Sequence, residues 1–304
     1  MTETSMTSPE KCGTVTLIGR PNAGKSSLIN ALLKTHALII SPKPQTTRNS
    51  VRCIYNDGNT QIIFTDTPGL YRADSRDKLG IFLNNSILDA LEDSDCILWL
   101  IEADTRKLKP DDLEIARILP KKIPVILTAN KSDKADPSEA FRLYETLYQF
   151  AGKVPVSAKT KRGIDALIQA ILPHIPEGEP LYDPDILMDT TEKFMASEII
   201  REKILMLLRD EVPHCVAVII DDYKSPEEYP DRKKLYIRAS LITETEGQKK
   251  ILIGSKGEMI KRIGEVSRKA IEEVTGIETY LDLWVKAVPN WRRNPAALRR
   301  LGYS

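Results

Sequence analysis

A glycine-rich loop between an apolar segment and a helical segment constrains the fold of this chain more than any other feature. Residues 19–26 read GRPNAGKS, which fits the pattern G-x-x-x-x-G-K-[ST]. In such loops the backbone N–H groups surround phosphate oxygens, and the following helix points its positive N-terminus at the anion. Because this geometry needs a strand before the loop and a helix after it, the pattern predicts an α/β domain that binds a nucleotide.

The residue types in this loop indicate separate chemical roles. Lys25 is expected to reach the β- and γ-phosphates and to stabilise the charge that develops during phosphoryl transfer. Ser26 is expected to offer its hydroxyl to Mg²⁺. Further phosphate contacts are expected from Gly19, Asn22, Ala23, Gly24, Ser27 and Gly69.

Three shorter motifs follow, each at the end of an apolar segment. DTPG, residues 66–69, places Asp66 where it can hold Mg²⁺. NKSD, residues 130–133, predicts that Asp133 accepts from N1–H and the 2-amino group of guanine, a pair of donors that adenine lacks. SAK, residues 157–159, is expected to support the base. The order of the motifs predicts a GTP site whose guanine contacts come from Asn130, Lys131, Asp133, Ser157, Ala158 and Lys159.

The sensor of the γ-phosphate is expected between the phosphate loop and the DTPG motif. QTTR, residues 45–48, is the candidate, since a threonine hydroxyl can complete the Mg²⁺ shell with GTP and leave it after hydrolysis. Spacing does not separate Thr46 from Thr47 as the metal ligand. We favour Thr47 and assign it, with Lys25, to catalysis. The alternative is a plain polar loop, because SPKP at residues 41–44 is typical of irregular structure.

Length and periodicity predict two domains, because 304 residues exceed the usual ~100–200 residues of one. In the first part, strands alternate with helical patterns, which favours a mostly parallel sheet covered by helices. The strands are expected at residues 14–18, 61–65, 96–101, 125–129 and 154–156, and the helices at 76–93, 137–151 and 164–172. We predict a GTP-binding domain at residues 1–175, a proline-rich linker with little to pack at 176–190, and a second domain at 191–304.

The second domain has a different pattern, which indicates a smaller α+β fold. A first helix is expected at about residues 191–210, and a long helix at 258–274. Strands are expected from the apolar segments 215–221, 235–242 and 280–288. Residues 248–253 fit a strand or a helix, and periodicity does not decide between them.

Charge is divided unequally along the chain. The formal net charge is +1, yet residues 248–304 carry 12 basic and 6 acidic side chains. A basic segment can hold a polyanion locally, although an ordinary solvated basic face has the same composition. No apolar run approaches the ~18–20 residues of a membrane span, and we expect no signal peptide. The four cysteines lack metal-ligand spacing and are expected to be reduced and packed.

GSKG within the basic segment fits the GxxG loop with which KH modules clamp a nucleic-acid backbone. The glycines allow close approach of a phosphate, and a helix with further cations follows. A single GxxG is weak on its own, because most such sequences are turns. The predicted RNA contacts are Gly254, Ser255, Lys256, Gly257, Lys261 and Arg262.

Taken together, GRPNAGKSSL, QTTR, DTPGL, NKSD, SAK and IGSKGEMIKRIG resemble the Era family of bacterial ribosome-assembly GTPases, in the translation-factor-related class. The resemblance covers nearly all of the chain beyond the first dozen residues. It implies a P-loop NTPase domain followed by a type II KH domain. It also implies a Mg²⁺-dependent GTPase that takes GTP and GDP, binds the 3′ end of 16S ribosomal RNA and assists 30S subunit assembly. We expect a cytoplasmic monomer with peripheral contact to the inner face of the cell membrane.

Two details follow from the resemblance. Leu70 stands after DTPG, where many GTPases carry a glutamine that orients the attacking water, so hydrolysis is expected to be slow without help. Asn22 corresponds to an asparagine that helps bind K⁺ beside the phosphates in related GTPases. An equal alternative is that Asn22 only shapes the loop.

Two rival functions remain open on the sequence alone. In the first, the protein uses GTP as a structural ligand with little hydrolysis, which Leu70 leaves possible but which Lys25, Ser26 and Asp66 oppose. In the second, the C-terminal domain of a GTPase binds protein rather than RNA.

Overall fold

A computed structural model describes residues 11–41, 43, 46–70 and 76–303 of the chain. Residues 1–10 and Gln45 of the predicted QTTR motif lie outside the described part. The chain divides into two compact units, Met1–Arg72 with Leu83–Asp189 and Ala73–Phe82 with Thr190–Ser304. Within the described residues, no helix combines the length and the apolar character that a membrane span requires.

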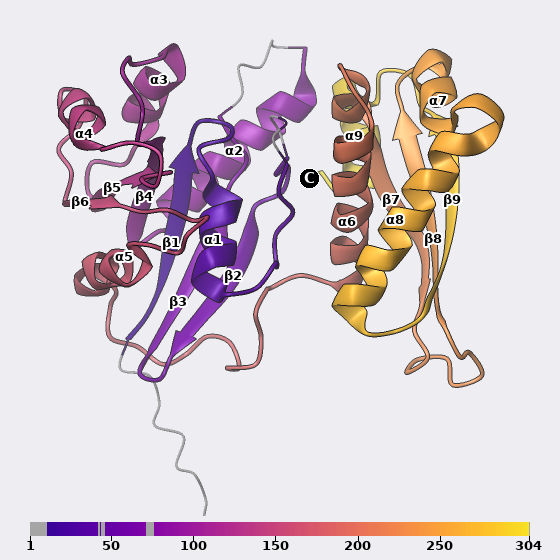
Figure 1. Cartoon of the computed structure of the whole chain (residues 1–304), viewed down its shortest axis with the longest axis horizontal. Coiled ribbons are helices and arrows are strands. Elements are labelled where there is room, and N and C mark those ends of the chain that lie inside the picture. The colour runs from indigo at the N-terminus through magenta and orange to yellow at the C-terminus, as the bar shows by residue number, and fades with distance from the viewer. Residues whose placement is uncertain (1–10, 42, 44–45, 71–75, 304) are drawn as a thin grey trace, which may run out of the picture. The chain divides into compact units, whose positions relative to one another are not determined.

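The first unit is built on a six-stranded sheet of order β2-β3-β1-β4-β5-β6 (Figure 1). All neighbouring pairs are parallel except β2 and β3, which confirms the predicted mostly parallel sheet. The strands are β1 (Lys11–Gly19), β2 (Val51–Asp57), β3 (Thr60–Asp66), β4 (Cys96–Glu102), β5 (Val125–Asn130) and β6 (Gly152–Pro155).

Helices flank this sheet and bury its central strands. The helices of this part of the chain are α1 (Lys25–Leu33), α2 (Lys78–Glu92), α3 (Pro110–Ile118), α4 (Ser138–Glu145) and α5 (Ile164–Ile171). Strand β4 is apolar along nearly its whole length because both of its faces are covered. Trp99 at its centre is fully buried and packs edge-on against Tyr144 of α4, with ring centroids 5.3 Å apart.

Three elements differ from the sequence prediction. Strand β2 was not predicted, although the Asp57-Gly58 pair before β3 is a hairpin signal. Helix α3 was not predicted either. The helix predicted at 137–151 ends at Glu145, because the chain turns there before it enters β6.

The prediction that residues 176–190 form a linker with few packing contacts was wrong. Residues 176–189 belong to the first unit. The N–H of Ile54 in β2 donates to Leu187 O at 2.9 Å, and the N–H of Asp189 donates to Arg52 O at 3.0 Å. The buried side chain of Gln61 accepts from two further backbone N–H groups of the segment. The segment therefore covers the outer edge of β2, which would otherwise expose unpaired backbone groups. We call residues 176–189 the edge strap.

The second unit has the order helix, strand, strand, helix, helix, strand. These elements are α6 (Glu192–Leu207), β7 (Ala217–Lys224), β8 (Leu235–Thr243), α7 (Glu246–Ile253), α8 (Glu258–Thr275) and β9 (Thr279–Ala287). Strand β8 pairs antiparallel with β7 and parallel with β9. The undecided segment 248–253 is helical, because Thr245 and Gln248 form a capping box that begins α7. The α+β fold predicted for this domain is confirmed.

The C-terminal tail is packed rather than free. Trp291 is fully buried, and its indole N–H donates to Cys215 O at 3.2 Å. Tyr303 stacks on Trp291 with ring centroids 6.0 Å apart, and the short helix α9 (Pro295–Arg300) lies between them in sequence. All four cysteines are buried and none forms a disulfide.

Candidate functional site

The phosphate loop connects the carboxyl end of β1 to the N-terminus of α1, as its sequence predicts. Gly24 adopts a φ of 98°, and a Cβ atom there would lie 2.2 Å from Nδ2 of Asn130. Both the backbone conformation and the close neighbour therefore require glycine. Helix α1 begins at Lys25, so its free N–H groups face the loop that is predicted to hold the phosphates.

Lys25 lies inside the loop. Its side chain is buried, and Nζ donates to the carbonyl oxygen of Gly19 at 3.1 Å. Burial lowers the pKa of Lys25 below its usual value, and the nearby Asp66 carboxylate opposes that shift. A phosphate anion in the loop would compensate the buried ammonium.

Three oxygen donors predicted to hold Mg²⁺ meet at one point. The Ser26 hydroxyl donates to Oδ2 of Asp66 at 2.6 Å, and the Thr47 hydroxyl donates to the same oxygen at 3.0 Å. Oγ of Ser26 and Oγ1 of Thr47 are 3.2 Å apart. Thr46 does not join them, since its hydroxyl donates to Lys43 O at 2.7 Å. The geometry thus separates the two threonines that spacing alone left equivalent.

A hollow opens between the phosphate loop and the described residues Ile39, Ile40, Ser41, Lys43, Thr46 and Thr47. Thr46 and Thr47 belong to its wall. Six of the predicted phosphate contacts also line it: Asn22, Gly24, Lys25, Ser26, Ser27 and Gly69.

At the base end of the site, Asn130 connects three motifs. Its buried side chain donates to Ala23 O at 2.9 Å and accepts from the N–H of Lys131 at 2.8 Å and of Ala158 at 3.1 Å. We predicted Asn130 as a guanine contact, and the observed bonds give it the additional role of joining the phosphate loop to NKSD and SAK.

Asp133 is the carboxylate that the site offers to a base. It is exposed, and its Oδ1 accepts from the Ser157 hydroxyl at 2.6 Å. This hydrogen bond is the main cause that lowers the pKa of Asp133, with Lys159 adding a smaller effect. The carboxylate is therefore ionised at neutral pH and can accept from two N–H donors.

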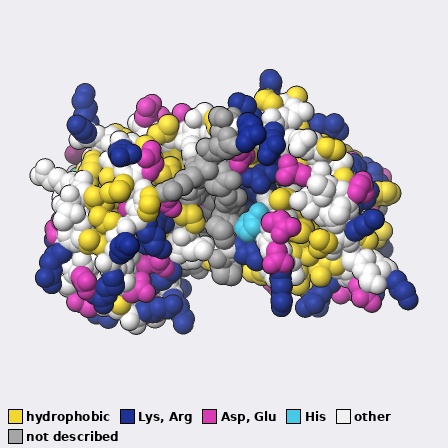
Figure 2. Space-filling model, turned by 90° about the horizontal axis from the view of Figure 1, so that it is seen from above, with side chains coloured by type: hydrophobic (Ala, Val, Ile, Leu, Met, Phe, Trp, Pro, Cys, Tyr) yellow, Lys and Arg dark blue, Asp and Glu magenta, His cyan; other side chains and the backbone are white. Residues whose placement is uncertain are grey.

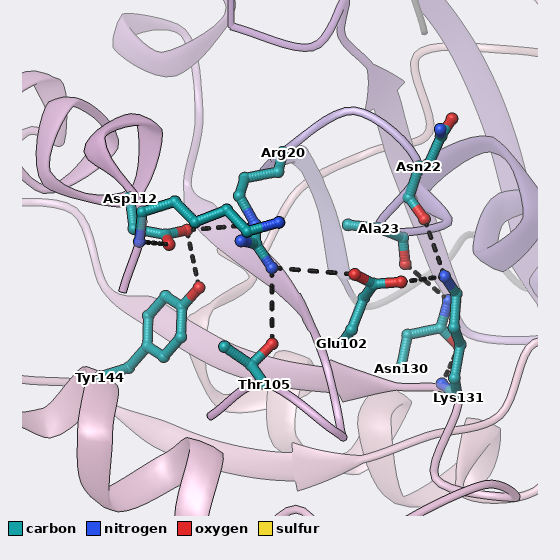
Figure 3. Close-up of polar contacts among 10 residues, drawn as sticks. Arg20, Asn22, Ala23, Glu102, Thr105, Asp112, Asn130, Lys131 and Tyr144 are labelled. Carbon is teal, nitrogen blue, oxygen red and sulfur yellow. Dashed lines mark hydrogen bonds and ion pairs between the residues drawn. The ribbon is translucent and has the colours of Figure 1, made fainter. Parts of the chain in front are cut away.

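A charged network behind the phosphate loop was missed by sequence reasoning (Figure 3). Nε of Arg20 lies 3.5 Å from Oδ1 of Asp112, and Nη2 lies 3.8 Å from Oε2 of Glu102. The Tyr144 hydroxyl donates to Asp112 at 2.7 Å. Glu102 also pairs with Lys131, whose Nζ donates to Asn22 O at 3.1 Å. The sequence held one indication that Glu102 belongs to this network. Glu102 ends β4 at the same sheet edge where Asp66 ends β3 and Asn130 ends β5.

The two residues singled out by the family resemblance, Leu70 and Asn22, differ in burial. Leu70 is half-buried against the apolar core around Trp99, so it presents no polar group to a water molecule. Asn22 is exposed, with a φ of 64°, and in Figure 3 its side chain points away from Lys131.

The GSKG loop joins α7 to α8 in the second unit. Gly254 has a φ of 75°, and a Cβ atom there would lie 2.7 Å from Cβ of Met259, so glycine is required. Lys256 has a φ of 50° and is exposed. Lys261 and Arg262 on the first turns of α8 are exposed too, and within the described residues none of these three cations forms a salt bridge. Ser255 and Gly257 complete the loop next to them.

Two protein families match the two parts of the chain. Residues 14–131 match the family described as 50S ribosome-binding GTPase. Residues 211–292 match the KH domain family. The first match spans the phosphate loop, DTPG and the start of NKSD, and the second spans the GSKG loop.

Full-length relatives are similar over almost the entire chain. GTPase Era of Halothermothrix orenii is 40% identical over 296 residues, which cover 96% of this chain and 98% of the relative. GTPase Era of Aquifex aeolicus is 41% identical over 302 residues, covering 97% and 99%.

Solved structures agree with this similarity. A crystal structure of a variant of Aquifex aeolicus Era bound to GDP and AlF4⁻ has a TM-score of 0.90 at 40% identity, covering 97% of this chain and 99% of that one. Era in complex with MgGDPNP and nucleotides 1506–1542 of 16S ribosomal RNA has the same TM-score at 41% identity and the same coverage. This chain is thus similar to these proteins over nearly their full length, and it belongs to the Era family of GTPases.

Proposed function

We propose that this chain is a switch that binds GTP and GDP, hydrolyses GTP to GDP and phosphate, and binds 16S ribosomal RNA to assist 30S subunit assembly. The observation that carries the enzymatic part is the meeting of Ser26, Thr47 and Asp66 beside the buried Lys25. A protein that used GTP only as a structural ligand would not need a threonine from a separate loop at that point.

The donor set at this point fits Mg²⁺. Two hydroxyls and a carboxylate supply only oxygen atoms, which are the ligands that Mg²⁺ prefers. When bound, the ion neutralises charge on the phosphate oxygens. Ser26, Thr47 and Asp66 would hold it. Support also comes from the related Era protein that was crystallised with MgGDPNP.

The chain positions the reacting groups rather than forming a covalent intermediate. Lys25 and the backbone N–H groups at the start of α1 stabilise charge on the phosphates, and water is the nucleophile. Leu70 offers no hydrogen bond to that water, so we propose that unassisted hydrolysis is slow. We further propose that Asn22 helps bind K⁺ beside the phosphates, and replacing K⁺ by Na⁺ should then lower the rate in the parent but not in Asn22→Ala.

RNA binding is assigned to the second unit. It is supported by the glycine-dependent GSKG geometry, by the exposed cations Lys256, Lys261 and Arg262, and by the 16S RNA fragment bound in a related Era complex. Assistance in 30S assembly follows from family membership. The cytoplasmic location, the peripheral membrane contact and the monomeric state stay predictions.

Multiple-turnover phosphate release tests the enzymatic proposal. The full chain with GTP, Mg²⁺, K⁺ and the 16S fragment of nucleotides 1506–1542 should release phosphate continuously. Lys25→Ala serves as the inactive control. The absence of turnover by the parent protein, with GTP binding intact, would favour the structural-ligand alternative.

The salt dependence of RNA affinity tests the binding partner. Replacing Lys256 by Ala should weaken binding and reduce the slope of log affinity against log salt by about 0.7, because one phosphate contact is lost. Gly257→Asp should weaken binding more strongly. If both variants kept the parent affinity and slope, the protein-binding alternative would gain support.

A further inference from the structure

The face of the β7-β8-β9 sheet opposite the helices carries aromatic side chains with no assigned role. Helices α6 and α8 pack on one face (Figure 1), where Leu235, Ile237 and Leu241 point into the core. Because strand side chains alternate, Tyr236 and the β9 residues Tyr280 and Trp284 lie on the other face. Tyr280 is 61% exposed and Trp284 56% exposed. We call this second surface the outer face.

One row across the outer face combines rings with cations. Lys224, Tyr236 and Tyr280 are register partners on the three strands. The two tyrosine rings stack with centroids 5.9 Å apart and an interplanar angle of 9°. Lys224 Nζ lies 5.8 Å from the Tyr236 ring centroid, and the guanidinium carbon atoms of Arg232 and Arg238 lie 5.1 and 5.8 Å from it. Three cationic side chains thus lie against the Tyr236 ring.

The next row carries one cation and two carboxylates. Arg238 lies between Asp222 at 3.4 Å and Asp282 at 3.2 Å, its register partners on β7 and β9. The Trp284 indole N–H donates to Asp282 at 3.0 Å. Since its single donor is satisfied within the face, Trp284 presents only its ring to a ligand.

This arrangement favours bases over phosphates at the centre of the outer face. A phosphate over Arg238 would approach the carboxylates of Asp222 and Asp282, whereas a base can stack on Tyr280 or Trp284 without meeting a like charge. The backbone would run near Arg232, which forms no salt bridge within the described residues, whereas Lys224 lies 3.8 Å from Asp222. Acidic and basic side chains are intermixed over the face of the molecule seen in Figure 2.

We propose that the outer face is a stacking platform for unpaired bases of single-stranded RNA, additional to the GSKG loop. The proposal rests on RNA binding by the second unit, proposed above. Tyr280 and Trp284 are four residues apart on one strand, hence about 13 Å apart, which leaves space for two bases. Aromatic rings on an open sheet stack bases with little dependence on sequence.

Tryptophan fluorescence tests the contact directly, because Trp99 and Trp291 are fully buried and Trp284 is exposed. In the full chain, acrylamide should quench Trp284, and saturating 16S fragment of nucleotides 1506–1542 should protect it. Trp284→Phe should remove the quenchable signal, which identifies Trp284 as its source. If quenching is unchanged when anisotropy of labelled RNA shows saturation, the platform is wrong, while RNA binding through GSKG stands.

Affinity measurements separate the platform from the loop. Tyr280→Ser with Trp284→Ser should weaken RNA binding about tenfold or more at every salt concentration, with an unchanged salt slope, because stacking is lost rather than a phosphate contact. Lys256→Ala should lower the slope instead. Tyr229→Ser, an exposed tyrosine in the loop between β7 and β8, is the matched control and should have no effect.

Two further outcomes would overturn the proposal. The same quenching experiment should be repeated with polyglutamate and with anionic lipid vesicles. If either protects Trp284 from acrylamide to the same extent as RNA, the surface does not select bases. Complete absence of RNA binding by the parent protein at low salt would reject the platform together with the proposed RNA function. Unchanged thermal melting of the double variant distinguishes a lost contact from lost folding.

Discussion

The side-chain amide of Asn130 donates to the backbone carbonyl oxygen of Ala23 at 2.9 Å, so the NKSD motif and the phosphate loop are joined directly. The Oδ1 atom of Asn130 accepts from the N–H groups of Lys131 and Ala158. One buried side chain thus holds three motifs in place, and the binding of a base and of its phosphates should depend on each other.

Asn130→Ala should weaken the binding of GTP and of GDP alike, by about 100-fold or more, because three backbone groups lose their partner at about 1–3 kcal/mol for each group left unsatisfied. Release of a fluorescent GDP analogue measures the effect as a faster dissociation rate. Ser138→Ala at the exposed start of α4 is the control. Release at the parent rate from Asn130→Ala would show that the two loops act independently.

The lowered pKa of Lys25 predicts that nucleotide binding is coupled to proton uptake. Burial favours the neutral amine in the free protein, whereas bound phosphates favour the ammonium, so the pKa should rise on binding. Between these two pKa values the complex holds one more proton, and affinity should fall as pH rises through the pKa of the free protein. Calorimetry in two buffers of different ionisation enthalpy measures the uptake. Equal uptake by Lys25→Met would assign it to another group.

The buried pair of Arg20 and Asp112 should matter for stability. The Asp112 side chain has no exposed surface and that of Arg20 is 9% exposed, so Asp112→Ala leaves a buried cation without its nearest carboxylate. We expect the free energy of unfolding to fall by about 3–5 kcal/mol, measured by urea denaturation followed by circular dichroism. Glu114→Ala, which breaks the exposed pair with Arg117, should change it little. Similar values for both variants would contradict the role of the buried network.

Gln61 should hold the edge strap in place. Its Oε1 accepts from the N–H groups of Leu181 and Tyr182 at 2.8 and 3.0 Å, and its Nε2 donates to Tyr182 O at 2.8 Å. Gln61→Ala should raise hydrogen exchange at Leu181 and Tyr182 by about tenfold or more, because buried hydrogen bonds worth about 0.5–1.5 kcal/mol each are lost. Amides in the centre of β4 should exchange as before. Unchanged exchange in the strap would show that the bonds to β2 hold it alone.

The sequence predicted the parts of this protein in which local pattern and tertiary structure agree. The phosphate loop, β4 and α8 carry a motif or a periodicity that needs no distant partner to recognise. The edge strap was read as a free linker because its hydrogen bonds to the sheet mostly use its own backbone groups, which bond to β2, a strand that was itself not predicted, to β1 and to the Gln61 side chain. Backbone partners leave no signal in side-chain composition.

The site residues also divide into those that a local motif identifies and those that only the tertiary structure identifies. Lys25, Ser26 and Asp66 occupy fixed positions in motifs, so spacing was enough to find them. Thr46 and Thr47 are adjacent and chemically identical, so only the path of the chain decides which one meets Asp66. The pairing of Arg20 with Asp112 joins residues 92 positions apart and has no local pattern at all.

The choice between these two threonines provides the most direct test of the account. Thr47→Ala and Thr46→Ala remove the same hydroxyl from neighbouring positions, so each is the control for the other. Phosphate release should be followed at saturating GTP with Mg²⁺, K⁺ and the 16S fragment. We predict that Thr47→Ala lowers turnover about tenfold or more, since a charge-assisted contact of about 1.5–3 kcal/mol is lost, and that Thr46→Ala stays near the parent rate. Equal loss in both variants, or a larger loss in Thr46→Ala, would contradict the assignment of Thr47 to the site formed with Ser26 and Asp66.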